Sequence, residues 1–258
     1  MKEIDLNSDM GEIPELIQNG TQETLMRSLS SVNIACGGHA GDEMTMKTTI
    51  EQALRWKLAL GAHPGYPDRE NFGRIDLDMS PAAIAETVFE QVRGFADIAA
   101  KCGASVAHVK AHGELYNAAG RRQEVARAIA SGVAQWSKEV VLMGLAGSPM
   151  LDIFRDAGFA VVAEAFADRR YEPDGSLRSR RYPDALIPDP RAAAQQVLRM
   201  VEHGTVTAVD GSEVRIDAQT ICIHSDTPGA PTIAAEVAAT LRAAGITLAP
   251  QGRGTRPL

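Results

Sequence analysis

Short apolar segments that alternate with helical patterns set the strongest limit on how this chain can fold. Seven segments have the length and composition of β-strands, and each is followed by glycine, polar residues and a helical pattern: 3–7, 32–36, 58–62, 105–111, 140–145, 159–166 and 220–224. Strands that alternate with helices in this way pair in parallel through right-handed crossovers. The sequence therefore predicts an α/β fold, and a closed seven-stranded (β/α) barrel is the natural arrangement.

Serine or aspartate followed by proline marks the start of several predicted helices. Each pair places a side-chain cap beside a proline whose fixed φ suits the first helical turn, and a later glycine supplies the left-handed stop. The pairs are Ser80-Pro81, Ser148-Pro149 and Asp189-Pro190, and the glycines that end these helices are Gly103, Gly158 and Gly204. These helix limits are therefore marked by residue chemistry as well as by periodicity.

One segment departs from the alternation of strands and helices. Residues 206–216 read VTAVDGSEVRI, and Asp210-Gly211 at the centre is typical of a type I′ hairpin turn. We interpret this hairpin as a decoration, since no stretch rich in proline, glycine or serine divides the chain. The expected organisation is one barrel domain over residues 1–258.

Composition and charge exclude several classes of protein. The chain is 45% hydrophobic and has a formal net charge of -7, which gives a nucleic acid no basic surface to bind. No run reaches the roughly 18 apolar residues of a membrane span, and the acidic start lacks a signal-peptide pattern. Three cysteines without a CxxC pair indicate neither a disulfide framework nor a thiolate zinc site. We expect a cytoplasmic protein that acts on a small molecule.

Polar residues share one face near the ends of several predicted strands. Alternation puts His108, Lys110 and His112 on one side of the fourth strand, and it groups Asn7 with Asp9 in the first. The same rule groups Glu164 with Asp168, and Cys222 with His224 and Asp226. Because a strand covered by helices should be apolar on both faces, this pattern predicts a site at the C-terminal strand ends. The alternative is that each residue hydrogen-bonds within its own turn.

Five segments that follow predicted strands are dense in glycine, histidine and acid. They are NSDMGE (7–12), NIACGGHAGD (33–42), GAHPGYPD (61–68), HVKAHGELYN (108–117) and IHSDTPG (223–229), and they hold five of the six histidines. Histidines beside carboxylates suit a divalent metal or proton transfer. A scattered metal site built from Asp9, His39, His63 and His112 is one interpretation. The strand context of the residues that separate His108 from His112 argues against a helical zinc motif.

Lys110 is unusual because it lies within an otherwise apolar strand. It either reaches solvent at the barrel rim or supplies a cation to a site, where Asp9 and Glu164 would be its counter-ions. The loop 165–183 carries five arginines in an acidic protein, and it is either a solvated surface or a lid that binds an anion. Its position after the sixth strand favours the lid, with Arg169 as the expected substrate contact.

Several catalytic motifs are absent from the sequence. There is no GxxxxGK[ST] segment, so a P-loop is excluded, and no GxGxxG follows a strand. A GxSxG nucleophile elbow is also missing. Cys36 and Cys222 lie within apolar strands and are more typical of small core residues than of nucleophiles.

The chain resembles the LamB/YcsF lactam-utilisation family. The resemblance depends on the segments DLNSDMGE, SSVNIACGGHAGD, GAHPGYPD, FGR, HVKAHGELYN, GLAGS, EAFADRRYEPDGSL and ICIHSDTPGA, which extend from residue 5 to about residue 230. Ser8, Ala111 and Ser225 depart from the family pattern, which usually has cysteine, proline and glycine there. The acids and histidines of the pattern are kept.

The resemblance implies a distorted barrel of the kind found in polysaccharide deacetylases. It also implies a hydrolase that cleaves 5-oxoproline (pyroglutamate) to glutamate with hydrolysis of ATP, because the family supplies the A subunit of the bacterial 5-oxoprolinase. Subunits B and C are then the implied partners. They would activate the lactam with ATP, and this chain would act on the activated ring.

A five-membered lactam is a poor electrophile, so its opening needs an activated water and a group that stabilises the oxyanion. We expect Asp9 to act as general base or metal ligand, with Lys110 and His112 beside the oxyanion or phosphate. The expected substrate-binding residues are Asn7, Asn33, Glu164, Arg169 and His224, and the expected ligands of a divalent metal ion are His39 and His63. Two alternatives stay open: a stand-alone metal-dependent deacetylase and a non-catalytic protein that binds the lactam for its partners.

Overall fold

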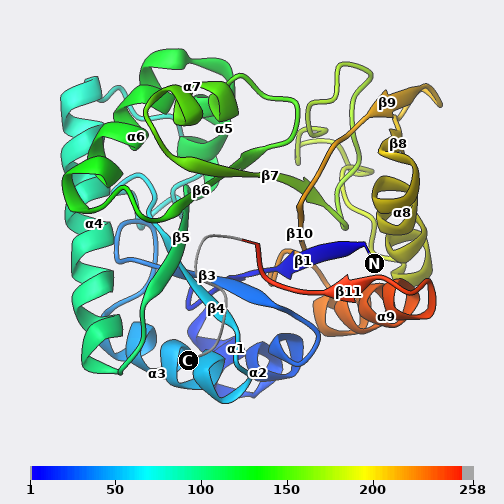
Figure 1. Ribbon diagram of the computed structural model, residues 1–258, viewed down its shortest axis with the longest axis horizontal. Helices are drawn as coiled ribbons and strands as arrows, with labels where there is room; N and C mark the ends of the chain where they lie inside the picture. The colour runs from blue at the N-terminus through cyan, green and yellow to red at the C-terminus, as the bar shows by residue number, and fades with distance from the viewer. Residues whose placement is uncertain (1, 252–258) are drawn as a thin grey trace.

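The computed structural model describes residues 2–251 and has a curled parallel β-sheet at its centre, with helices around the outside (Figure 1). In spatial order the strands are β11 (Thr247–Leu248), β1 (Glu3–Asn7), β10 (Thr220–Cys222), β7 (Ala160–Phe166), β6 (Val141–Leu145), β5 (Val106–Lys110), β4 (Ala59–His63), β3 (Ser31–Ala35) and β2 (Asp9–Met10). All neighbouring strands in this sheet pair in parallel. The α/β class and the seven predicted strands are therefore confirmed.

The predicted number of strands and the predicted closure are both wrong. Within residues 2–251 the sheet has nine strands because β2 and β11 join it. Each of these two is only two residues long, too short to produce a hydrophobic period. The sheet is also not a closed ring, because β1 pairs with β10 and β11 whereas β2 pairs with β3. Two backbone hydrogen bonds lie near this break between β1 and β3. The N–H of Ser30 donates to the carbonyl oxygen of Leu6 (2.9 Å), and the N–H of Asn33 donates to the carbonyl oxygen of Ser8 (3.0 Å).

Nine helices cover the sheet within residues 2–251. They are α1 (Pro14–Gln18), α2 (Thr21–Met26), α3 (Glu43–Arg55), α4 (Pro81–Lys101), α5 (Gly113–Arg121), α6 (Gln123–Trp136), α7 (Met150–Asp156), α8 (Pro190–His203) and α9 (Ala230–Ala243). Two predicted caps are confirmed, since Ser80 accepts from the backbone of Ala83 and Asp189 from that of Ala192. The third differs: α7 begins one residue later than expected, with Pro149 as its N-cap.

The predicted hairpin is present as a separate two-stranded sheet. β8 (Thr205–Thr207) and β9 (Glu213–Arg215) pair antiparallel. The turn is not type I′, because that turn needs positive φ at both central residues. Gly211 has φ 88°, but Asp210 is not among the described non-glycine residues with positive φ. A longer loop over residues 208–212 replaces the two-residue turn, and Ala208 donates to the carbonyl oxygen of Ser212 (2.8 Å).

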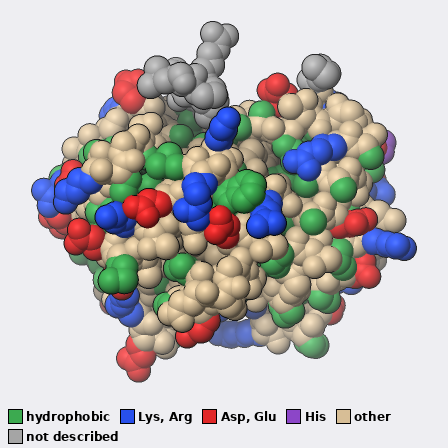
Figure 2. Space-filling view, turned by 90° about the horizontal axis from the view of Figure 1, so that it is seen from below, with side chains coloured by type: hydrophobic (Ala, Val, Ile, Leu, Met, Phe, Trp, Pro, Cys, Tyr) green, Lys and Arg blue, Asp and Glu red, His purple; other side chains and the backbone are tan. Residues whose placement is uncertain are grey.

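The apolar core lies between the outer face of the sheet and the helices. Leu6, Val109 and Ile221, which alternate with the polar strand residues, are at most 1% exposed and belong to this core. On the face shown in Figure 2, acidic and basic side chains are intermixed and apolar ones are scattered. Within the described residues, no helix combines the length and the apolar character that crossing a membrane requires.

Candidate active site

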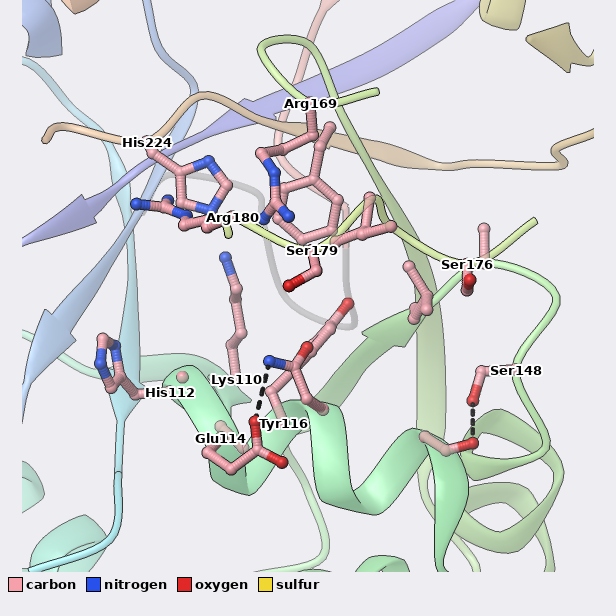
Figure 3. Close-up of a pocket in the computed structure, with 18 of the residues that line it drawn as sticks. Lys110, His112, Glu114, Tyr116, Ser148, Arg169, Ser176, Ser179, Arg180 and His224 are labelled. Atoms are coloured by element: carbon pink, nitrogen blue, oxygen red, sulfur yellow. Dashed lines mark hydrogen bonds between the residues drawn. The ribbon is translucent and has the colours of Figure 1, made fainter. Parts of the chain in front are cut away.

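A cavity of about 940 Å³ opens at the C-terminal ends of the strands (Figure 3). Its lining comes from the segment after β1, the ends of β4 and β5, the start of α5 and the loops after β6, β7 and β10. The polar lining residues that carry the argument below are Asp9, Glu12, His63, Lys110, His112, Arg169, Arg180, His224 and Asp226. The cavity therefore lies where the sequence predicts the site, since parallel strands present their C-terminal ends at one edge.

Lys110 is buried between two carboxylates. Its Nζ atom lies 2.9 Å from Asp9 Oδ1 and 2.9 Å from Glu164 Oε1, and the residue is 3% exposed. Burial alone lowers the pKa of Lys110, but Asp9, Cys222 and Glu164 outweigh it and raise that pKa well above its usual range. The expected counter-ions are confirmed, and the interpretation of Lys110 as a side chain that reaches solvent is wrong.

A layer of amides beneath the cavity holds this ion pair in place. Asn33 donates from Nδ2 to Asn7 Oδ1 (2.8 Å) and to Asp9 Oδ1 (2.8 Å), and Asn7 donates to Glu164 Oε1 (3.1 Å). His108 Nε2 lies 2.7 Å from Asn33 Oδ1, and burial lowers the pKa of His108 to about 3, so the ring is neutral. Asn7, Asn33 and Glu164 are fully buried and lie outside the cavity lining.

Three histidines converge on Glu12, a residue that is not among the predicted site residues. Glu12 Oε1 lies 2.9 Å from His39 Nε2, 2.9 Å from His112 Nδ1 and 3.6 Å from His63 Nε2. Burial raises the pKa of Glu12, but His112 and His39 outweigh it and lower that pKa far below its usual range. The sequence signal for Glu12 is its position in NSDMGE, one of the five segments dense in glycine, histidine and acid. Strand alternation could not predict the direction of its side chain, because Glu12 lies beyond the strand.

Second hydrogen bonds fix the orientation of two of these rings. His63 Nδ1 lies 2.7 Å from the carbonyl oxygen of Lys110, and His112 Nε2 lies 2.9 Å from that of Phe72. Because a carbonyl only accepts, these nitrogens carry the hydrogens. The opposite nitrogens, His63 Nε2 and His112 Nδ1, are then lone-pair acceptors in the neutral rings, and they lie only 3.1 Å apart. Phe72 reaches this position with a φ of 56°, a left-handed conformation that costs energy.

This donor set fits a divalent metal ion. Two imidazole lone pairs and the Glu12 carboxylate face one another, so a cation or shared protons must lie among them. Ligand atoms of Glu12, His39, His63 and His112 all lie within 4.8 Å of one another. Carbonyl partners on the far ring nitrogens are also typical of metal-ligating histidines. Imidazole with one carboxylate suits zinc and similar transition metals.

A second cluster of metal-type ligands has a different explanation. Ligand atoms of Asp9, Cys222 and His224 also lie within 4.8 Å of one another. Lys110 Nζ, however, already lies 2.9 Å from Asp9 Oδ1 and 3.3 Å from Cys222 Sγ. The ammonium group supplies the positive charge there, so this cluster does not need a metal ion.

Arginines from two loops also line the cavity. Arg169 is 7% exposed, its Nη2 donates to the carbonyl oxygen of Arg178 (2.6 Å), and its buried Nε has no partner among the described residues. Burial and nearby Arg180 lower the pKa of Arg169 to about 10. Arg180 and Arg74 both pair with Asp226, at 2.9 and 2.5 Å. Arg169, the expected substrate contact, lines the cavity, and so do Arg180 and its partner Asp226, which are not among the expected substrate contacts.

The fold and the site define a class of α/β protein with a buried lysine–carboxylate group and a histidine–carboxylate cluster at the strand ends. The chain matches the LamB/YcsF family over residues 4–255 and belongs to that family. It is 51% identical to the A subunit of 5-oxoprolinase from Chloroflexus aggregans over 96% of this chain and 98% of the relative. It is 46% identical to the protein of that name from Shouchella clausii over 96% and 98%.

A solved structure shows the same architecture. The lactam utilization protein from Thermus thermophilus superposes with a TM-score of 0.87 at 37% sequence identity, covering 96% of this chain and 99% of that one. The family resemblance indicated by the sequence motifs is therefore confirmed along nearly the whole chain.

Proposed function

We propose that this chain is the A subunit of an ATP-hydrolysing 5-oxoprolinase and that it opens the ring of 5-oxoproline to give L-glutamate. The full-length relatives that carry the name of this subunit support the proposal. The observation that carries it is the ion pair of Lys110 with Asp9 and Glu164 beside the histidine–Glu12 cluster, at the floor of a cavity. This arrangement offers a base and a cation to one carbonyl group.

The residues take the following parts in ring opening. Asp9 removes a proton from the attacking water as its oxygen bonds to the ring carbon. Lys110 Nζ lies next to the negative charge that develops on the carbonyl oxygen. Asn7, Asn33 and Glu164, which lie beneath the cavity, position these two groups. Arg169 and His224 line the cavity and bind the substrate, Arg169 through the carboxylate of the lactam.

A divalent metal ion completes the proposed site. Glu12, in place of Asp9, joins His39, His63 and His112 in holding it, because ligand atoms of all four lie within 4.8 Å of one another. The bound ion supplies Lewis acidity toward the substrate oxygen. Since both ring nitrogens of His112 are engaged, His112 acts as a ligand, and of the two residues expected beside the oxyanion Lys110 is the one that contacts it.

ATP and partner proteins belong to the same proposal. The relatives are named as one subunit of an enzyme, so we propose that ATP is used together with subunits B and C, which activate the lactam. A cytoplasmic location is supported by Cys36, Cys102 and Cys222, which are all free. We also propose that the chain acts as one domain, since the site draws on residues from Asp9 to Asp226.

A reconstitution assay tests the function. The purified chain, alone and with co-expressed subunits B and C, receives 5-oxoproline with and without ATP, and glutamate and phosphate are measured. Turnover should require all three proteins and ATP. Asp9→Asn and Lys110→Met should each lower kcat by about 10²-fold or more, whereas Lys47→Met, which changes an exposed lysine of α3, should not. Full activity in a folded Asp9→Asn variant would contradict the assignment and favour a protein that only binds the lactam.

The same assay separates the remaining alternative. A stand-alone deacetylase would release acetate from an N-acetylated sugar without ATP or partner proteins. The metal is tested independently by elemental analysis of tag-free protein, which should contain about one divalent ion per chain, and Glu12→Gln should lose it. A chelator should abolish turnover and a divalent ion should restore it; unchanged turnover in metal-free protein would overturn the metal assignment.

A further inference from the structure

His224 is held by a buried carboxylate that the roles above leave unused. Asp168 is 0% exposed and lies just beyond β7, whereas His224 lies just beyond β10. His224 Nδ1 lies 2.9 and 3.1 Å from the two oxygens of Asp168, and the backbone N–H of His224 donates to the same carboxylate (3.2 Å). Thr227 Oγ1 donates to it as well. Asp168 therefore accepts hydrogen bonds from three groups of one loop.

This arrangement fixes which nitrogen of His224 faces the cavity. Because the ionised carboxylate only accepts, Nδ1 carries a hydrogen and Nε2 is the free end of the ring. The ring stacks on Phe166, with centroids 5.2 Å apart and planes 13° from parallel. Within the described residues the ring hydrogen-bonds only to Asp168. His224 is thus oriented on one side and unengaged on the side that lines the cavity.

His224 also lies close to the proposed base. A ring nitrogen of His224 lies within 4.8 Å of a carboxylate oxygen of Asp9, and Figure 3 shows the ring near the end of Lys110. A substrate atom between Asp9 and His224 would contact both. Lys110 already pairs directly with Asp9 at 2.9 Å, so His224 is available for a separate task.

The chemistry of ring opening supplies that task. The C–N bond of a lactam breaks only if its electron pair leaves with nitrogen, and an amide anion is too basic to leave without a proton. This requirement is the same whether the ring oxygen carries a phosphoryl group or not. Asp9, Lys110 and the proposed metal site all serve the water and the oxygen, so the nitrogen still needs a proton donor.

We propose that His224 is the general acid for the leaving nitrogen and that Asp168 is its positioning residue; this inference rests on the proposed function. Asp9 takes a proton from water, the water oxygen bonds to the ring carbon, and the C–N electron pair moves to nitrogen. Nitrogen receives the proton from His224 Nε2 and leaves as the amine of glutamate. Asp168 keeps the hydrogen of the other nitrogen in place and stabilises the imidazolium.

A comparison of two substrates distinguishes general-acid catalysis by His224 from a role in substrate binding alone. His224→Gln in the reconstituted complex should lower kcat for 5-oxoproline by about 10²-fold or more, with KM changed less than about 3-fold. On the thiolactone analogue, in which sulfur replaces the ring nitrogen, the same variant should lose less than about 3-fold, because a thiolate leaves without a proton. Free imidazole should restore turnover of 5-oxoproline in His224→Ala. His203→Gln, at the exposed end of α8, is the matched control.

Asp168→Asn provides a second variant that keeps the shape of the site. Its amide can donate to Nδ1 and so favours the ring tautomer without a hydrogen on Nδ1, and it no longer supplies the negative charge that stabilises the imidazolium. We expect the same selective loss on the lactam, and the Asp168→Glu variant should recover part of it.

The outcomes separate this inference from the proposed function. An inactive wild-type complex would overturn the function, and the inference with it. An active wild type with equal losses on lactam and thiolactone, or with no loss in His224→Gln, would overturn the inference alone. If the wild type does not accept the thiolactone, the imidazole measurement decides: recovery supports the general acid, and no recovery overturns it.

Discussion

At the scale of single residues, the buried interior holds more acids than permanent cations. Among the described residues, Asp5, Asp9, Glu164 and Asp168 are buried, against Lys110 and Arg169. Burial raises the pKa of Asp5, which accepts hydrogen bonds from three hydroxyl side chains. Lys110 has to neutralise both Asp9 and Glu164. The ion pair therefore has structural as well as chemical importance.

Loss of Lys110 should destabilise the fold. Lys110→Met leaves two buried carboxylates without their cation, so we expect about 3 kcal/mol or more of unfolding free energy to be lost at pH 7. The double variant Lys110→Met/Glu164→Gln removes one of the two charges and should recover part of that loss. Urea unfolding followed by circular dichroism measures both, with Lys47→Met as control. Equal stability of Lys110→Met and the control would show that the pair is not needed for folding.

The contribution of Asp168 to stability should depend on pH. Burial raises the pKa of Asp168, but His224 and Thr227 outweigh it and the net shift is downward. A carboxyl group with a lowered folded pKa stabilises the protein above its unfolded pKa of about 3.9, and that contribution is lost as pH falls through the folded pKa. Asp168→Asn should therefore cost about 2 kcal/mol at pH 7, and the difference should shrink below about pH 4. Unfolding curves between pH 3 and 8 that show a constant difference would contradict this.

At the scale of elements, the sequence was most informative where one residue type has one physical role. The apolar runs predicted the seven strands that form most of the sheet, and Ser80 and Asp189 marked two helix starts, because these signals are local. β2 and β11 could not be predicted, since two residues carry no period and their pairing depends on distant strands. The prediction of a type I′ turn was wrong because the length of the loop, rather than the Asp-Gly pair alone, sets the turn type.

Substitution by alanine should change the free energy of unfolding in opposite directions at two helical glycines. Gly132 of α6 lies against α4, where an added Cβ would clash with the carbonyl oxygen of Ala85. Gly94 of α4 is exposed, and nothing lies within 4 Å of its added Cβ. Gly132→Ala should cost about 2 kcal/mol through overpacking, and Gly94→Ala should gain up to about 1 kcal/mol through helix propensity. Thermal and urea unfolding measure both, and similar shifts would refute the close approach of α4 and α6.

At the scale of the whole molecule, the site exists only because distant segments meet. Lys110 contacts Asp9 across 101 positions of sequence and Asn7 contacts Glu164 across 157. Strand alternation predicted that these side chains share a face, because every parallel strand presents the same end. It could not reveal that Glu12 gathers three histidines, since that depends on loops and on backbone carbonyls that fix the rings.

Metal binding should therefore act on the stability of the whole chain. The four proposed ligands come from separate segments between residues 12 and 112, and unfolding would pull these segments apart. At a free Zn²⁺ concentration of about 100 times Kd, the folded state should gain about 2.7 kcal/mol. For a chain of this size the gain corresponds to a rise in Tm of roughly 5–10 °C. Differential scanning fluorimetry of chelator-treated, tag-free protein during Zn²⁺ titration measures it.

The matched variants decide whether such a rise comes from this cluster. Glu12→Gln removes the anionic ligand that all three histidines face, so its Tm should stay flat during the titration. Glu51→Gln changes an exposed acid of α3 and should follow the wild type. An equal rise in all three proteins would place the metal elsewhere. If the Tm of the wild type also stays constant, no metal ion binds at this cluster. Shared protons then lie between His63 and His112, and ring opening depends on Asp9 and Lys110 without a metal.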